Sequence, residues 1–376
     1  MTLPLGTRAA YVRRLLYAGL TAAILRQRSS GEGEAVSRCG TRNQTYKTLG
    51  GIMTHATVAR IPRISQRRLL KAIQRLGGRI ETSKDGEKSL RIPGGLLRFD
   101  LEIQRGALTP LGYWGGDAFH DPDQAPLVMR INDLNGGEVP GVVSAFQCGN
   151  SPNHSHVLVC GPPLLAEYAT DAQLDLLIAG YAKKMVRAFH ALDRKFSGST
   201  VPLPRGTGLR MARRKKESTR YGVAEVSLQR IADLAQTMSF GATSVSVTGS
   251  VAQGYVLIVV DGLQIRVGHA RDGSGDVELM TYAPAAHCAC YWPNVLQWAI
   301  DVNEAQSEVS ARIISAPDDS NLVFNGYALI PTDCGYTNEQ LAYQVDGLVR
   351  QLVGLAEDFY DAFNPTRALF MPDGCG

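Results

Sequence analysis

The sequence predicts an α+β protein built from two tandem copies of one domain, each with the element order α-β-β-β-α-β-β-α and an antiparallel sheet. Three observations lead to this fold class. A Thr-x-x-Gln capping box opens an apolar helix at Thr170 and again at Thr337, 167 residues later. The apolar stripes of the two helices match at seven consecutive positions. The elements that precede each helix also follow nearly the same order.

Both long helices carry an apolar stripe with alternating steps of three and four residues, so one side of each helix is expected in a core. Two unrelated amphipathic helices would share this spacing. They would not be expected to share a capping box and an upstream order as well, and the sequence therefore favours a repeat. The first stripe comprises Leu174, Ile178, Tyr181, Met185, Ala188, Leu192 and Phe196, and the second comprises Leu341, Val345, Leu348, Leu352, Leu355, Phe359 and Phe363.

The first copy is predicted over residues 61–196. Its first helix, over residues 65–76, ends at Gly77-Gly78, because glycine commonly closes a helix. Asp85-Gly86 is typical of a hairpin turn between two short strands. The remaining elements are, in order, a strand over 96–103, a Gly-rich stretch over 111–123, a helix over 126–134, strands over 141–146 and 156–160, and the capped helix.

The second copy is predicted over residues 223–363. A helix over residues 227–238 is closed by Gly241, and Asp261-Gly262 is expected to form a hairpin turn. The second copy has one more possible strand than the first. Its strands are expected over 243–247, 255–260, 263–267, 277–282, 309–314 and 322–330, with a middle helix over 295–303.

The charge is distributed unevenly along the chain, although the net charge is only +4. Residues 1–60 carry 9 Lys/Arg and 2 Asp/Glu, whereas residues 223–376 carry 6 Lys/Arg and 18 Asp/Glu. Residues 197–222 are basic and rich in Pro and Gly, which is typical of a linker. Opposite charges on two tethered halves favour contact, so we expect a salt-sensitive interface with apolar contacts at its centre and charges at its rim.

The two ends of the chain are predicted to lie outside the domains. Residues 364–376 are expected to form a C-terminal tail. Residues 1–60 are interpreted as a disordered tail, as the result of a start codon placed too early, with Met53 as the alternative start, or as an export signal around residues 15–25. No apolar run reaches the roughly 20 residues of a membrane-spanning helix. The seven scattered cysteines favour a reducing compartment, so the predicted localisation is cytoplasmic, without a membrane partner.

Two groups of histidine and cysteine residues combine possible metal ligands. His287, Cys288 and Cys290 have the ligand types that suit zinc. A structural zinc site usually needs a second matching pair, and none appears, so small buried or loop cysteines are the simpler interpretation. His154 and His156 alternate along a strand and share a face, where exposed histidines are the simpler interpretation. We therefore predict neither a metal nor a cofactor.

Other candidate site residues have equally plain interpretations. Cys160 or Cys334 would need a nearby base to act as a nucleophile, and the sequence favours neither, so no catalytic residue is predicted. Trp292 and Trp298 are expected to pack in the core rather than to stack on a ligand. There is no phosphate-binding glycine loop. A basic run could hold phosphates electrostatically but lacks interleaved aromatic residues, so a solvated linker is the simpler interpretation. That run is Arg213, Arg214, Lys215 and Lys216.

The sequence resembles the YbjN family, whose members are bacterial domains with a fold like that of type III secretion chaperones. The resemblance covers residues 61–196 and 223–363 and is stronger in the second copy. It rests on the element order and on short motifs in the middle and last helices. These motifs are Ile131-Asn132 and Val302-Asn303, the Thr-x-x-Gln-Leu helix starts, the Asp261-Gly262 hairpin, and Tyr327-Ala328-Leu329-Ile330 leading to Thr337.

The resemblance implies a function without catalysis. The family is described as candidate regulators of sensory transduction, and the fold analogy implies a protein- or peptide-binding protein of chaperone-like or regulatory type. Chaperones of this fold work as dimers, which implies that the two copies pair as an intramolecular dimer. The alternative function is nucleic-acid binding through the basic linker and tail. An uncharacterised enzyme is the third candidate.

Overall fold

A computed structural model of the chain describes most of the residues after Arg60, and Arg60–Gly376 form one compact unit. The predicted tails over 1–60 and 364–376, and most of the predicted linker, lie outside the described residues. The described residues are 61–102, 106–116, 118–119, 127–135, 139, 141–148, 151–197, 202, 206–210, 212, 221–249, 251–270, 274–284, 292–305, 308–315 and 322–363.

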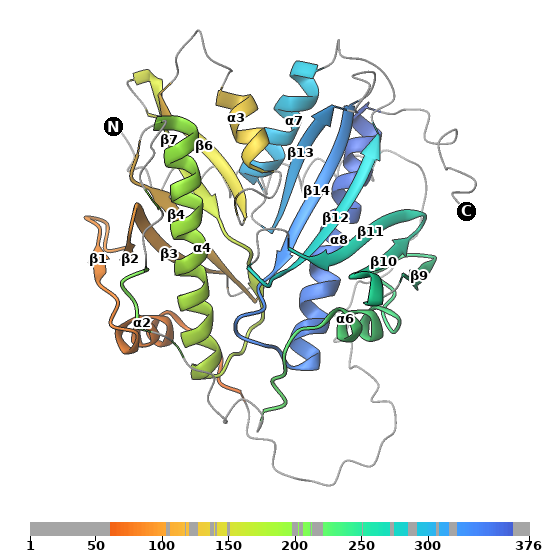
Figure 1. The fold of residues 1–376 in the computed structure, drawn as a ribbon, viewed down its shortest axis with the longest axis horizontal. Coiled ribbons are helices and arrows are strands. Elements are labelled where there is room, and N and C mark those ends of the chain that lie inside the picture. The colour runs from red at the N-terminus through yellow and green to blue at the C-terminus, as the bar shows by residue number, and fades with distance from the viewer. Residues whose placement is uncertain are drawn as a thin grey trace, which may run out of the picture. The chain divides into compact units, whose positions relative to one another are not determined.

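The helices and strands occur in nearly the same order in residues 61–197, here called the first half, and residues 221–363, the second half (Figure 1). The first half contains α2 (Gln66–Arg75), β1 (Ile80–Thr82), β2 (Lys88–Ile92), β3 (Gly95–Glu102), β4 (Ala107–Trp114), β5 (Ala118–Phe119), α3 (Leu127–Leu134), β6 (Val142–Cys148), β7 (Ser151–Cys160), β8 (Leu164–Leu165) and α4 (Asp171–Ser197). The second half contains α6 (Leu228–Ala235), β9 (Val245–Thr248), the 3₁₀ turn η1 (Val251–Gln253), β10 (Tyr255–Val260), β11 (Leu263–His269), β12 (Val277–Pro284), α7 (Trp292–Ala305), β13 (Val309–Ser315), β14 (Leu322–Ile330) and α8 (Asn338–Phe363).

Each half contains one antiparallel sheet. The first sheet has the order β1-β2-β3-β4-β7-β5, with β6 paired to β7 and β8 paired to β4. The second has the order β13-β14-β12-β11-β10-β9. Antiparallel strands joined by hairpins, with helices on the sheets, confirm the predicted α+β class. None of the helices that the structure describes is both long and apolar enough to cross a membrane.

The predicted order of the first half lacks β4. We expected a Gly-rich irregular stretch from residue 111, but Ala107–Trp114 pairs with β3 along its whole length. Proline is tolerated in a strand where its missing N–H is not needed by the ladder. Pro110 lies between the residues of β4 that pair with β7 and those that pair with β8, and its carbonyl accepts from Gly161 N at 2.8 Å. Among the described residues, the first half, with the short β5, therefore has five strands before the middle helix rather than the predicted three, whereas the second half has the predicted four.

The two long helices bury the predicted stripes. Leu174 and Leu341, the first residues of the stripes, are fully buried, and so are the next five members of each stripe. Phe196 and Phe363 end the stripes and are partly buried against the same core. Figure 1 shows α4 lying over the strands of the first sheet and α8 lying against those of the second. A periodicity of 3.6 residues therefore identified the buried side of both helices correctly.

Asparagine side chains form hydrogen bonds with backbone groups of β6 and β13. Asn135 exchanges two hydrogen bonds with the backbone of Val143, and Asn303 does the same with Ala311. In each case the asparagine lies eight residues before its partner. An amide side chain that pairs with backbone N–H and C=O groups satisfies an edge that could otherwise add another strand.

The equivalent asparagines are therefore Asn135 and Asn303, and not Asn132 and Asn303 as the sequence motifs suggested. Asn132 instead exchanges two 2.8 Å hydrogen bonds with the backbone of Ile313, in β13 of the other half. It thus serves the contact between the halves.

Candidate functional site

Both predicted capping boxes are present. Thr170 N donates to Gln173 Oε1 at 2.9 Å, and Gln173 N donates to Thr170 Oγ1 at 3.0 Å. Thr337 and Gln340 form the same reciprocal pair at 2.9 and 3.1 Å. Each box satisfies two N–H groups that a helix start leaves without partners. The boxes therefore fix the starts of α4 and α8 in the same way.

The two cap glutamines also bond to each other and to the opposite half. Gln173 Nε2 donates to Gln340 Oε1 and to the carbonyl of Gly335, both at 3.0 Å. Gln340 Nε2 donates to the carbonyl of Tyr168 at 2.7 Å. Tyr168 and Gly335 are 167 residues apart, like the glutamines. The two halves thus meet through one set of bonds, made twice with the roles exchanged.

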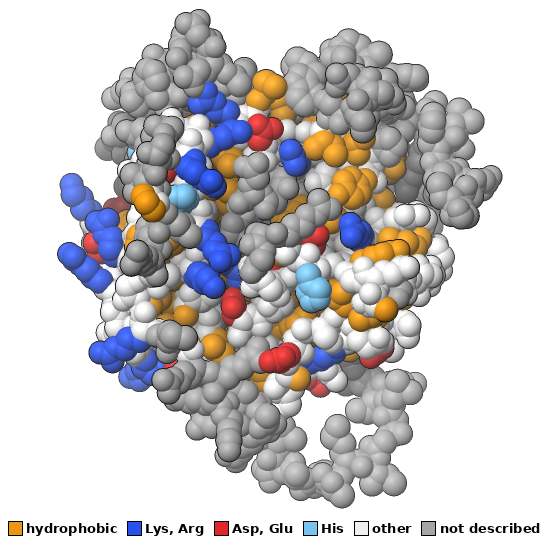
Figure 2. Space-filling view, viewed as in Figure 1, with side chains coloured by type: hydrophobic (Ala, Val, Ile, Leu, Met, Phe, Trp, Pro, Cys, Tyr) orange, Lys and Arg blue, Asp and Glu red, His pale blue; other side chains and the backbone are white. Residues whose placement is uncertain are grey.

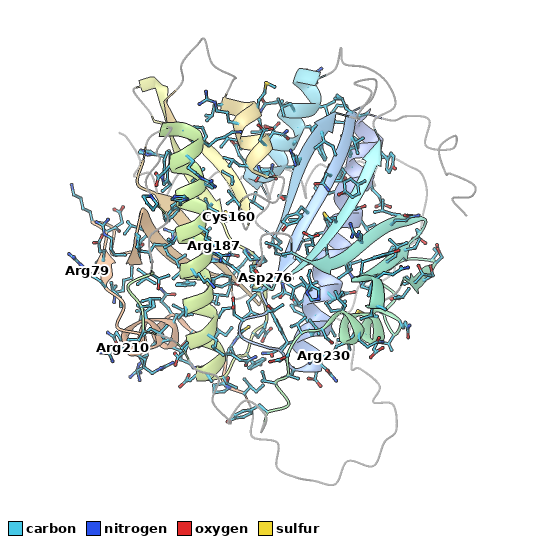
Figure 3. The ribbon with its side chains drawn as sticks, in the orientation of Figure 1. Arg79, Cys160, Arg187, Arg210, Arg230 and Asp276 are labelled. Atoms are coloured by element: carbon cyan, nitrogen blue, oxygen red, sulfur yellow. The ribbon has the colours of Figure 1, made fainter. Side chains whose placement is uncertain are left out.

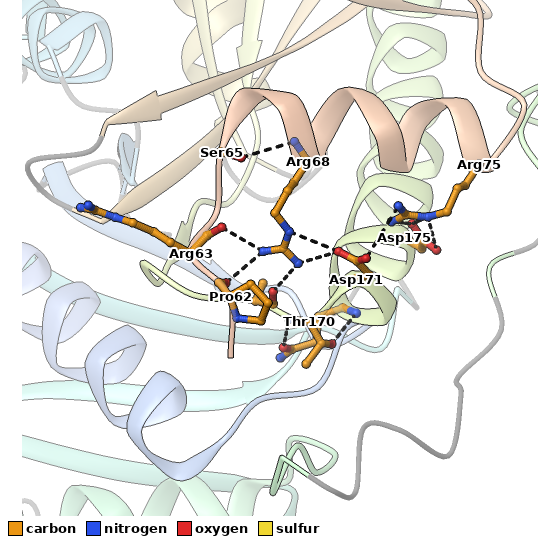
Figure 4. A network of polar contacts seen from close by, with 10 residues as sticks. Pro62, Arg63, Ser65, Arg68, Arg75, Thr170, Asp171 and Asp175 are labelled. Atoms are coloured by element: carbon orange, nitrogen blue, oxygen red, sulfur yellow. Dashed lines mark hydrogen bonds and ion pairs between the residues drawn. The ribbon is translucent and has the colours of Figure 1, made fainter. Parts of the chain in front are cut away.

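An arginine organises the entry to each long helix. Arg68 donates to the carbonyls of Pro62, Arg63 and Ala169 and to the carboxylate of Asp171, as Figure 4 shows. The guanidinium ties the first turn of α2 to the start of α4. A second ion pair on the same side of α2 joins Arg75 to Asp175 at 2.6 Å.

Arg230 makes the equivalent contacts in the second half. It donates to the carbonyls of Ala224, Glu225 and Tyr336 and to the side chain of Asn338. Asn338 takes the place of Asp171, so the guanidinium of Arg230 faces a neutral amide where that of Arg68 faces a carboxylate. Burial lowers the pKa of Arg230, and the charge of Glu339 opposes that shift.

Glycines in the two long helices allow close approach of the opposite half. A Cβ on Gly180 of α4 would collide with Asp333 Oδ2, and a Cβ on Gly347 of α8 would lie 2.7 Å from Leu165 Cδ1. The two glycines are 167 residues apart. Glycine costs helix stability relative to alanine, so its use at both equivalent positions reflects the space that the contact needs.

Lys184 forms a buried ion-pair network between the halves. Its Nζ lies 2.7 Å from Asp333 Oδ2 and 3.1 Å from Asp276 Oδ2, and its side chain is 5% exposed. Asp276 is fully buried, and its other oxygen accepts from Thr332 N at 3.0 Å. Figure 3 shows Asp276 close to the middle of α4. The residue equivalent to Lys184 in α8 is Gln351, so this network has no counterpart.

The charges in this network shift each other's ionisation. Burial lowers the pKa of Lys184, but the negative charges of Asp276 and Asp333 outweigh it, and the pKa lies above its ordinary value. Burial raises the pKa of Asp276, and the ammonium of Lys184 opposes this shift. A buried ion pair is screened less by salt than an exposed one. The expected interface, with charge only at its rim, is therefore wrong on this point, because the closest charges lie inside it.

The two candidate nucleophiles, Cys160 and Cys334, are both buried. Burial raises the pKa of Cys334 to about 12, so its thiol is not activated. Cys160 is 1% exposed on β7 and packs with Leu111, Val142 and Leu158. Neither environment is that of a reactive cysteine, which is typically electropositive and partly exposed.

Of the remaining candidate residues, the structure describes the side chains of Trp298 and His156. Trp298 packs against Phe324 and Phe359, with ring centroids 5.5 and 5.1 Å away, as expected for a core residue. His156 is exposed at the first sheet. Among the described residues, no group of three or more His, Cys, Asp or Glu side chains could hold a metal ion. The side chains that lie outside the described residues are His154, His287, Cys288, Cys290, Trp292, Arg213, Arg214, Lys215 and Lys216.

Part of the predicted linker packs on the first half. The side chain of Leu209 lies beside Gly78 and contributes to the core. Arg210 N donates to the carbonyl of Leu76 at 2.8 Å. This docking closes the C-terminal end of α2, and composition alone did not indicate it, because residues 197–222 are dominated by polar, Pro and Gly residues.

The outer face of α4 carries basic side chains, which Figure 2 shows gathered over this helix. Lys183 and Arg194 are exposed and Arg187 is half-buried. Sequence reasoning used α4 only for its apolar stripe and did not single out these residues. The signal was present, because they recur with steps of four and seven residues on the side opposite the core.

Comparisons with known proteins show what the chain is similar to. No family model matches the chain, and no curated protein matches it. Among solved structures, the chain is similar to YbjN from E. coli, described as a candidate transcription regulator, with a TM-score of 0.29 and 12% sequence identity. The match covers 38% of this chain and 97% of that chain. The comparison therefore identifies a weak similarity of fold to YbjN over part of the chain.

Proposed function

We propose that residues 61–196 and 223–363 are two tandem YbjN-like copies that pair within one chain, and that the chain is a non-catalytic protein- or peptide-binding protein of regulatory or chaperone-like type. The pairing is supported by contacts that recur with exchanged roles. Ser144 Oγ donates to the carbonyl of Asn303 at 3.1 Å, and Ser310 Oγ lies 3.4 Å from that of Asn135. Such reciprocity is typical of two-fold pairing.

The observation that carries the binding function is the use of the buried polar groups. Lys184, Asp276, Gln173 and Gln340 are at least nine-tenths buried, and each bonds across the contact between the halves. A catalytic group must instead face a place where a substrate can sit. Side chains of types that often take part in catalysis therefore hold the two halves together in this protein. This use favours a protein that acts by binding partners on its outer surface.

In-cell cross-linking followed by mass spectrometry tests this function. The full chain is expressed in its native cell, cross-linked and purified, and a captured protein is then made separately and titrated against the full chain. We expect direct, saturable binding with a defined stoichiometry. A charge-matched unrelated protein serves as the control. The proposal is wrong if no captured protein binds directly, or if the purified chain turns over a substrate.

Nucleic-acid binding is the second candidate function, favoured by the basic run Arg213–Lys216. Phosphate binding weakens steeply with salt, because each neutralised phosphate releases counterions. Titration of the full chain with a 20-nucleotide DNA strand at about 50 and 200 mM salt measures this dependence. Nuclease treatment of the cross-linked material gives an independent readout. Tight binding that falls steeply with salt, with nuclease-sensitive capture, would replace protein binding by nucleic-acid binding.

A further inference from the structure

The exposed side of α4 forms a line of positive charge, here called the α4 stripe and made up of Lys183, Arg187 and Arg194. At 100° per residue, these positions lie within about 40° of one another around the helix axis. Lys183 and Arg194 are eleven residue steps apart, which corresponds to about 16 Å along the helix at about 1.5 Å per residue. His190 falls on the same side of the helix. The neighbouring Lys184 points away, into the contact between the halves.

The α4 stripe is not neutralised by the described part of the protein. Within the described residues, none of its three cations takes part in an ion pair or hydrogen bond. Several other basic residues of the first half are paired with carboxylates. Arg68 bonds to Asp171, Arg75 to Asp175 and Arg98 to Glu87. The fold thus supplies carboxylates for these cations, whereas Lys183, Arg187 and Arg194 have none among the residues that the structure describes.

The same side of α8 has the opposite character. The residues 167 positions after Lys183, Arg187, His190 and Arg194 are Arg350, Gly354, Glu357 and Asp361. Arg350 is bound by Asp346 at 2.8 Å, one turn away. Both helices carry out the same packing role on their buried sides. The basic charge on α4 is therefore not a requirement of the fold.

We propose that the α4 stripe is the docking surface for an acidic helical segment of a partner protein, which lays carboxylates along Lys183, Arg187 and Arg194. This inference rests on the proposed protein-binding function and names its surface. Carboxylates with matching spacing on one side of a helix would face the three cations together. Arginine binds a carboxylate with two parallel hydrogen bonds, which adds geometric selectivity to the charge attraction.

Two observations favour a short acidic segment over a nucleic acid. Residues 223–376 carry 6 Lys/Arg against 18 Asp/Glu, so the second half of the same compact unit would repel a long polyanion that extends beyond the stripe. Proteins that bind single strands usually add aromatic platforms to a basic groove. Tyr181 and Phe189, the aromatic residues of α4 next to Lys183 and Arg187 in sequence, are fully buried, and Phe196 near Arg194 packs partly against the core.

Fluorescence anisotropy with the full-length protein tests the docking surface. The probe is a labelled 20-residue helix-forming peptide of Glu, Ala and Gln, with Glu at steps of four and seven residues. Its scrambled version, with the same composition, is the peptide control. A labelled 20-nucleotide oligo(dT) is the nucleic-acid arm. Binding of each probe is measured at low and at physiological ionic strength, because charge contacts are screened by salt.

The stripe variant is K183Q/R187Q/R194Q, and the control variant is R79Q/K84Q/K88Q. The control removes three exposed cations from the β1–β2 hairpin of the same half. Individually, exposed ion pairs contribute little, so three together are expected to change affinity by about tenfold. We expect the stripe variant to bind the peptide about tenfold more weakly and the control variant to bind it like the wild-type protein. The melting temperatures of both variants establish that they are folded.

Three results would overturn the inference. Equal losses in the two variants would show that only net charge matters. If the scrambled peptide bound as tightly as the patterned peptide, the spacing of carboxylates on one side of a helix would not matter. Tighter, stripe-dependent binding of oligo(dT) would assign the surface to nucleic acid. The proposed function is tested separately, because a cellular protein partner that binds the stripe variant as well as wild type would sustain protein binding and reject this surface.

Discussion

Gln173 Nε2 lies 3.0 Å from Gln340 Oε1, so the glutamine of one capping box contacts its own counterpart 167 residues later. In a two-fold symmetric pair, a residue meets its counterpart only close to the axis. The glutamines thus do two things, since each caps its own helix and each reaches into the opposite half. Substitutions here affect helix starts and assembly together.

Replacing Gln173 by alanine is expected to destabilise the protein by about 1–3 kcal/mol, because buried groups lose their partners. Those groups are the N–H of Thr170, the carbonyl of Gly335 and the amide of Gln340. Urea unfolding measures the change. Q229A is the control, because Gln229 is exposed and, within the described part of the chain, its side chain bonds to Asp233 on its own helix. Equal stabilities of Q173A and wild type would mean that the bonds between halves contribute nothing.

K184M is expected to cost about 3–5 kcal/mol, because it leaves a fully buried carboxylate at Asp276 without its cation. The double variant K184M/D276N should recover part of the loss, since it removes the uncompensated charge. Urea unfolding of wild type, both single variants and the double variant gives the coupling energy. K183M, one residue away on the exposed side, is expected to stay within about 0.5 kcal/mol of wild type. A K184M loss as small as that of K183M would contradict the assignment.

Alanine substitutions at helix glycines should have opposite effects. G354A is expected to stabilise α8 by up to about 1 kcal/mol, because alanine is the better helix former and the Cβ meets nothing within 4 Å. G180A gains the same propensity but pushes Asp333 away from Lys184, so we expect a net loss. G347A should also lose stability through contact with Leu165. Thermal unfolding compares the three variants, and a stabilised G180A would show that the close approach is unnecessary.

The carboxyl of Asp261 is expected to titrate at an unusually low pH. Its pKa is lowered to about 2 by hydrogen bonds from the side chain of Thr243 and the backbone of Ser244. Since the folded pKa lies below the unfolded value, the associated stability is present above about pH 4 and is lost as pH falls towards 2. NMR titration of the carboxyl carbon measures the pKa. T243V should raise it, and an ordinary value in wild type would contradict these bonds.

Salt should have little effect on the contact between the halves. The network of Lys184, Asp276 and Asp333 is largely buried, and buried pairs are weakly screened. We therefore expect the radius of gyration, measured by small-angle scattering, to be the same at about 50 mM and 1 M salt. This differs from the salt-sensitive interface that charge distribution alone predicts. Expansion at high salt would show that exposed charges hold the halves together.

Local chemistry and periodicity determined much of this protein from sequence alone. A capping box depends on residues three positions apart, so Thr170 and Thr337 marked two helix starts without any knowledge of the fold. Burial every 3.6 residues identified the sides of α4 and α8 that face the core. The turns at Asp85-Gly86 and Asp261-Gly262 located two hairpins, because the chain needs a positive φ there.

Tertiary structure alone decided the features that depend on residues far apart in the chain. β4 was missed because Pro110 and Gly112 disfavour a strand locally, and only the arrangement of β7 and β8 beside it makes the proline acceptable. Asn132 in α3 and Asn135, directly after α3, are the same residue type, yet Asn135 bonds within its own half and Asn132 bonds to the opposite half. Lys184 and Lys183 are neighbours in sequence, but one is buried between two carboxylates and the other is exposed. A side chain's partner is set by what packs opposite it, and periodicity carries no information about that.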